Sequence, residues 1–105
     1  MNIAFLVIAG RFHPSYPHLT KVRWIKYDFE TRDRLSDAED VDVSEVIEAI
    51  EHDYRVEIGF PTNDGKYVQG QLLTVVDGDD GEKRVVPSIS AVPGYNFSDL
   101  PPLNA

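Results

Sequence analysis

The sequence predicts a single α+β domain, in which one antiparallel sheet of four or five strands carries one amphipathic helix on one face. Three observations predict this fold class: short segments that alternate apolar and polar residues, one segment with helical periodicity, and turn residues between the later segments. The chain has 105 residues, a length that suits one core and leaves no room for two. We therefore expect residues 1–105 to form one domain.

Two segments near the N-terminus predict strands. Residues 3–9 are seven consecutive apolar residues, which is the length of a strand buried on both faces and is too short to cross a membrane. Residues 19–27 alternate, with basic residues between aromatic and apolar ones. Val22 and Trp24 fall on one side of this alternation, and we expect that side to face the core because tryptophan gains the most from burial.

One segment has the periodicity of an amphipathic helix. Its apolar residues recur at i, i+3, i+4 and i+7, at Val43, Val46, Ile47 and Ile50. Asp42 is placed to cap the first turn, and Glu45 three residues later completes a capping-box pattern. We expect the helix to begin near Asp42 and to end near His52, whose ring can interact with the last carbonyls.

The segment after the helix predicts a strand and a hairpin. Residues 54–60 alternate apolar residues with residues of the opposite face, as in a strand with one face covered. The expected core residues are Val56, Ile58 and Phe60, and the expected outer residues are Arg55, Glu57 and Gly59. Asp64 and Gly65 then predict a tight turn, because both residue types tolerate a positive φ.

The remaining strands predict a meander. The return strand, residues 67–76, contains Gly70, which indicates a bulge or a bend. The segment "DGDDGE", residues 77–82, predicts a second hairpin turn, because its spacing does not match a helix-loop-helix calcium site. A last strand, residues 83–88, contains Pro87, which suits an edge or an end of a sheet.

The tail of the chain is unusually apolar. It carries Tyr95, Phe97, Leu100 and Leu103, and two prolines hold part of it extended. We expect this tail to dock on the sheet or on the helix. An extended, proline-containing segment is also a type of ligand that other domains bind, and this alternative stays open.

Charge is segregated along the chain, whose formal net charge is −8. Residues 37–53 contain eight carboxylates and no lysine or arginine, whereas most of the basic residues precede them. This acidic region is either a solvated surface or a surface that docks on a basic protein. The candidate partner-binding residues are Asp37, Glu39, Asp40, Glu45, Glu48 and Glu51.

No pattern in the sequence predicts a catalytic, cofactor-binding or metal site. His13 and His18 lie around two prolines at a spacing that matches no common zinc motif. The chain has no cysteine, which excludes thiolate chemistry and suits a reducing compartment, so we expect a cytoplasmic protein without a cofactor. The negative charge disfavours nucleic-acid binding, although residues 19–27 interleave basic and aromatic side chains.

Several segments follow one another in an order known from a protein family. They are "HLTKVRW", "DVSEVIEAIEHD", "YRVEIGF", "GKYVQGQLLTVV" and an ending with Asn96, Phe97, Leu100 and Pro101. Together they resemble a family of short bacterial domains of unknown function, the domain of unknown function 3892 type. The resemblance covers residues 18–103, and residues 3–9 and 77–82 are additional to the family pattern. It implies no activity, but it makes the apolar tail a family feature.

These observations favour a non-enzymatic protein-binding module, accessory or inhibitory, that uses its acidic helix face. Two alternatives stay open: a small-molecule binder or enzyme whose site is assembled from distant residues, and an inhibitor that mimics phosphate on a nucleic-acid-binding protein. A basic strand and an acidic helix on one chain can also pair between two copies, which would give a homodimer.

Overall fold

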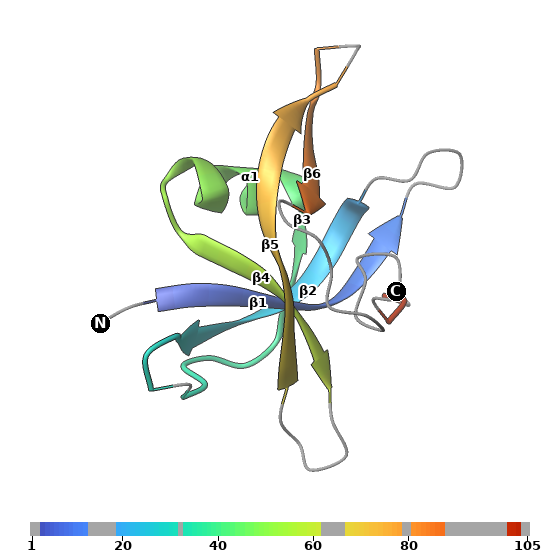
Figure 1. Ribbon diagram of the computed structural model, residues 1–105. Coiled ribbons are helices and arrows are strands. Elements are labelled where there is room, and N and C mark those ends of the chain that lie inside the picture. Colours follow the sequence, from blue (N-terminus) through green and yellow to red (C-terminus); the bar gives the residue numbers. More distant parts are fainter. Residues whose placement is uncertain are drawn as a thin grey trace.

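Six strands and one helix make up the part of the protein that the computed structural model describes, residues 3–12, 19–31, 33–61, 67–78, 81–87 and 101–103. In chain order they are β1 (Ile3–Phe12), β2 (Leu19–Asp28), β3 (Glu39–Asp42), α1 (Val43–Glu51), β4 (Arg55–Pro61), β5 (Tyr67–Asp77) and β6 (Lys83–Pro87). The strands form one sheet in the order β3-β2-β1-β4-β5-β6 (Figure 1).

The expected α+β class is confirmed, but the expectation of four or five antiparallel strands is wrong. The sheet has six strands and is mixed, because β1 and β4 pair in parallel. The chain runs from β1 to β2 and β3 as an antiparallel series and then crosses back through α1 to place β4 beside β1. A parallel pair needs such a crossover, and α1 supplies it.

The apolar run near the N-terminus becomes the central strand β1, between β2 and β4. Alternate residues of β1 enter two separate apolar clusters: Phe5 and Val7 lie in one, and Ala4 and Leu6 in the other. The prediction of a strand buried on both faces is therefore confirmed. We call the face that α1 covers the helix face and the opposite one the second face.

The helix lies on the helix face and begins and ends where the sequence predicts, with Asp42 as N-cap residue and His52 as C-cap residue. Val46 and Ala49 are buried against the core. The capping box is wrong, because the Asp42 side chain makes no capping hydrogen bond. At the other end the His52 ring nitrogen Nδ1 lies 2.8 Å from the carbonyl oxygen of Glu48.

The helix stops through backbone geometry as well. Asp53 has a φ of 65°, and its N–H donates to the carbonyl of Ile50 at 3.0 Å. The N–H of Tyr54 donates to the carbonyl of Ala49 at 3.0 Å. These two bonds form a Schellman motif, with aspartate at a position that glycine usually occupies. The turn directs the chain straight into β4.

Strand β5 joins two parts of the sheet. Its first part pairs antiparallel with β4, and its second part, from Leu73 to Asp77, pairs antiparallel with β6. The β4–β5 register shifts by one residue across the segment that contains Gly70, so the predicted bulge is confirmed. Pro87 ends the edge strand β6, also as predicted.

Both predicted hairpins connect neighbouring antiparallel strands. The Asp64–Gly65 turn between β4 and β5 lies outside the described residues. In the second hairpin, the N–H of Gly78 donates to the carbonyl of Glu82 at 2.7 Å, and Gly81 has a φ of +82°. Asp79 and Asp80 lie outside the described residues, as do His13 and His18.

The end of the chain docks on the sheet, as predicted, at the residues that the structure describes. Pro102 forms a parallel bridge with Gly10 at the end of β1, where the C-terminus lies in Figure 1. The N–H of Gly10 donates to the carbonyl of Pro101, and the N–H of Leu103 donates to the carbonyl of Gly10, both at 3.0 Å. Leu103 is buried. Tyr95, Phe97 and Leu100 lie outside the described residues.

The second face contains a charged residue that the alternation of β4 had placed in solvent. Glu57 is only 3% exposed, so the expectation that one face of this strand is uncovered is wrong. Its carboxylate accepts hydrogen bonds from the Tyr27 hydroxyl and from Nε of Arg55. These donors satisfy a charge that would otherwise be costly to bury.

Candidate functional site

The six predicted partner-binding residues lie along one stretch of chain that leads into β3 and through α1. All six are exposed, as a solvent-facing surface requires: Asp37, Glu39, Asp40, Glu45, Glu48 and Glu51. By composition alone they form one acidic surface. The structure divides them according to the partners that they contact.

Asp40 is engaged within the protein. It pairs with Arg23 of β2, and the two hydrogen bonds from Nε and Nη2 of Arg23 to its carboxylate measure 2.7 and 3.2 Å. The hydrogen bond from Arg23 is the main cause that holds the pKa of Asp40 below its usual value. Because Arg23 alternates with the helix-face residues Val22 and Trp24, this pair lies on the second face.

Glu51 is also engaged. Its carboxylate pairs with the ammonium group of Lys83 on β6. The hydrogen bond to Glu51 is the first cause of the raised pKa of Lys83, followed by the charge of Glu51. Both side chains are close to half exposed, so this pair contributes little to stability. The pair connects the C-terminal end of α1 to the edge strand β6.

Glu39 and Glu45 differ from these two residues, because they converge on a surface cavity. The cavity has a volume of about 260 Å³ and is lined by Phe5, Trp24, Lys26, Ser36, Glu39 and Glu45. Glu39 is brought there by the β2–β3 pairing, in which it lies opposite Trp24. Glu45 comes from the first turn of α1.

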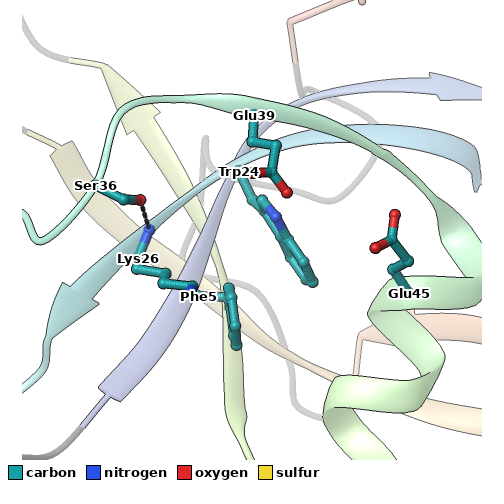
Figure 2. A pocket seen from close by; sticks show the side chains of 6 residues that line it. All are labelled: Phe5, Trp24, Lys26, Ser36, Glu39 and Glu45. Atoms are coloured by element: carbon teal, nitrogen blue, oxygen red, sulfur yellow. Dashed lines mark hydrogen bonds between the residues drawn. The ribbon is translucent and has the colours of Figure 1, made fainter.

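Two stacked aromatic rings form the floor of this cavity. The ring centroids of Phe5 and Trp24 are 4.2 Å apart, and their planes are inclined by 25°. Tyr54 packs edge-on against the Phe5 ring, with the two ring centroids 5.6 Å apart. Figure 2 shows the indole ring of Trp24 between Phe5 on one side and the Glu39 and Glu45 carboxylates on the other.

Lys26 supplies the positive charge of the cavity wall. Its Nζ lies 6.0 Å from the centroid of the Phe5 ring, at the limit of a cation–π contact. Its backbone N–H donates to Oγ of Ser36 at 3.0 Å, which holds the chain before β3 against β2 (Figure 2). Among the described residues neither Glu39 nor Glu45 forms an ion pair, with Lys26 or with any other cation.

The sequence identifies Glu39 and Glu45 as candidate binding residues, but it does not reveal the cavity. Phe5 and Trp24 were expected to be core residues, and both are indeed almost fully buried, at 8% and 6% exposed. The signal that could have found the cavity is the pairing of β3 with β2. That pairing places a glutamate beside the single tryptophan. It is not evident from the sequence, because β3 has only four residues and three of them are acidic.

A second cavity lies at the opposite end of the helix. Its volume is about 420 Å³, and its walls combine apolar residues with two charged ones. The lining residues are Ile3, Phe29, Ile50, Asp53, Tyr54, Arg55, Val56, Leu72 and Leu73. Arg55, which also holds Glu57, lies over the Phe29 ring at 5.5 Å from its centroid.

Comparison with known proteins found no matching family model, no matching curated protein and no matching solved structure. The resemblance to the short bacterial domains therefore stays a prediction. Within the described ranges, no three residues of the histidine, cysteine, aspartate and glutamate types are grouped so that they could hold a metal ion. In the same part of the chain, no helix is long and apolar enough to cross a bilayer.

Proposed function

We propose that this protein is a non-enzymatic protein-binding module that docks its acidic surface on a basic partner protein. The observation that carries the proposal is the division among the exposed carboxylates. Asp40 and Glu51 are neutralised by Arg23 and Lys83. Asp37, Glu39, Glu45 and Glu48 have no ion-pair partner among the described residues, so the docking surface consists of these four.

The unpaired carboxylates are arranged to repel one another. Glu45 and Glu48 are three residues apart on α1, and like charges at that spacing destabilise a helix by a few tenths of a kcal/mol. A basic partner surface would remove this repulsion and would be steered toward the negative field before contact. Binding of this kind weakens as salt rises, because screening acts on exposed charges.

The test is capture of partners by the tagged protein from lysate of its host, at low and at physiological salt, with mass spectrometry of the retained proteins. The informative variant is Glu45→Lys/Glu48→Lys, which leaves the Glu51–Lys83 pair intact. The matched control is Glu30→Lys/Asp33→Lys, which changes the net charge equally at two exposed positions between β2 and β3.

We expect the wild type and the control to retain a partner that salt releases, and the helix variant to lose it. Equal retention by the helix variant would overturn the proposal, and so would the absence of any retained protein at either salt. If duplex DNA displaces the partner, the module acts as a phosphate mimic on a nucleic-acid-binding protein.

A second candidate function rests on the cavity of about 420 Å³ beside Tyr54, whose size falls in the range of small-molecule sites. A thermal-shift screen of metabolites tests it. The expected sign is a rise in melting temperature that Tyr54→Ala abolishes, since Tyr54 is 46% exposed and its side chain lines that cavity.

A further inference from the structure

We infer that the cavity beside Trp24 receives one arginine side chain of the basic partner. The inference rests on the proposed function and identifies the contact at its centre. The cavity joins an aromatic floor, Phe5 and Trp24, to two unpaired carboxylates, Glu39 and Glu45. A flat cation that can stack on an aromatic ring and donate several hydrogen bonds matches both parts, and the guanidinium group of arginine has these properties.

The size of the cavity favours a single side chain. Its volume of about 260 Å³ lies below the range of about 300 to 1,000 Å³ that is typical of small-molecule sites. Its exposed wall residues, Lys26, Glu39 and Glu45, place it at the surface, whereas its floor is buried. An arginine reaching in from a docked protein would therefore enter with its guanidinium group first, place it over the aromatic floor and beside the two carboxylates, and leave its stem along the cavity wall.

Two elements deliver the carboxylates, which makes the site specific to this fold. Glu39 is fixed by the β2–β3 register opposite Trp24, and Glu45 by the start of α1. Two carboxylates on separate elements can each accept from a different edge of one guanidinium group. A lysine ammonium is more strongly hydrated and cannot stack, so arginine is preferred.

Lys26 is the cation already present in the cavity wall. It lies over Phe5, at 6.0 Å, and not in an ion pair with Glu39 or Glu45. One ammonium group beside two carboxylates leaves the cavity with one net negative charge, which an incoming arginine would neutralise. The position of Lys26 leaves the carboxylates available.

Trp24 is the only tryptophan of the chain, so its indole signals report on binding in the cavity. The protein is titrated with three capped pentapeptides that place arginine, lysine or neutral citrulline between glycines, while indole fluorescence and the indole N–H resonance are followed. We expect a saturable change with the arginine peptide, with a dissociation constant on the order of a millimolar, weaker binding of lysine and none of citrulline.

The variants separate the cavity from the general acidity of the surface. Glu39→Gln and Glu45→Gln should each weaken arginine binding by about tenfold or more, the usual effect of removing a charged hydrogen-bond partner. Glu48→Gln removes the same charge from the same helix but from outside the cavity, so it should change binding by less than about twofold. Equal effects of all three variants would overturn the inference.

A labelled oligoarginine, followed by fluorescence anisotropy, distinguishes failure of the inference from failure of the proposed function. If oligoarginine binds in a salt-sensitive way that Glu45→Lys/Glu48→Lys abolishes, but the Trp24 signals never change, the arginine cavity is wrong and the acidic docking surface stands. If neither the single-arginine peptide nor oligoarginine binds, both are wrong.

Discussion

On the helix face of the sheet the buried residues are apolar, whereas on the second face one of them is a carboxylate. Val7, Val46 and Ile58 are fully buried on the helix face. On the second face, Glu57 is buried opposite Leu6 of β1 and is held by hydrogen bonds from Tyr27 and Arg55. The acidic residues of this protein therefore have different roles: Glu57 is structural, while those around α1 remain in solvent.

From this comparison we expect the helix face to contribute most of the free energy of unfolding. The largest loss should follow a substitution at the centre of that face. Ile58→Ala removes a fully buried side chain and leaves a cavity, so we expect a loss of about 2 to 5 kcal/mol in the free energy of unfolding. Urea denaturation followed by circular dichroism measures it. The control is Val76→Ala at a position that is 41% exposed, where a change below about 0.5 kcal/mol is expected. Equal effects would remove the contrast between buried and exposed positions.

The second face should respond to hydrogen bonds. Tyr27→Phe removes one donor to the buried Glu57 carboxylate while keeping the ring, and we expect a loss of about 1 to 3 kcal/mol. Tyr54→Phe deletes the same hydroxyl type from a residue that is 46% exposed and should be nearly neutral. If Tyr27→Phe is as harmless as Tyr54→Phe in urea denaturation, Glu57 does not depend on this hydrogen bond.

The second face is also tightly packed at one glycine. A Cβ atom at Gly59 would lie 2.5 Å from Cγ of the buried Leu6, so Gly59→Ala should cost about 1 to 3 kcal/mol through overpacking. Gly81→Ala differs in its cause. A Cβ atom at Gly81 would have no atom within 4 Å, but the residue has a φ of +82°. The substitution should cost about 1 kcal/mol through backbone strain alone. Adding Leu6→Ala should reduce the Gly59→Ala effect and leave the Gly81→Ala effect unchanged, as a double-mutant cycle measures.

The elements that sequence patterns predicted are those that local signals define. The helix from Asp42 to His52 and the bulge at Gly70 follow from periodicity and from a single residue type. The parallel pairing of β1 with β4 is non-local, because it depends on where a crossover returns the chain. The burial of Glu57 is equally non-local, since its donor Tyr27 is thirty residues away.

The candidate site was predictable only in part, because it too depends on contacts between residues that are far apart in the sequence. The acidic residues were found from composition, and their exposure is as expected. The cavity needs Glu39 and Glu45 to meet at Trp24, and this depends on β3, a strand that is too short and too acidic to be recognised from alternation. Composition alone makes Asp40 a candidate partner-binding residue. The structure shows that Arg23 of the same chain already pairs with it.

The smallest expected effect compares two arginine–carboxylate pairs on the second face. Arg55 pairs with the buried Glu57, while Arg23 pairs with Asp40 at 42% and 43% exposure. The Arg23 hydrogen bond lowers the pKa of Asp40, so this pair stabilises the protein above the ordinary carboxyl pKa of about 4 and loses that contribution as pH falls through the lowered value. Asp40→Asn should therefore lower the melting temperature slightly at pH 7, and the gap to wild type should close as pH falls below about 4.

Salt separates the exposed pair from the buried one. In about 1 M sodium chloride the screening length falls to about 3 Å, so the difference between Asp40→Asn and wild type should become smaller at pH 7. The Tyr27→Phe difference should persist, because Glu57 is shielded from solvent and ions. If salt abolished both differences, Glu57 would behave as a surface charge, and the contrast between the two faces would fail. If salt affected neither, the Arg23–Asp40 contact would act through its hydrogen-bond geometry and not through charge.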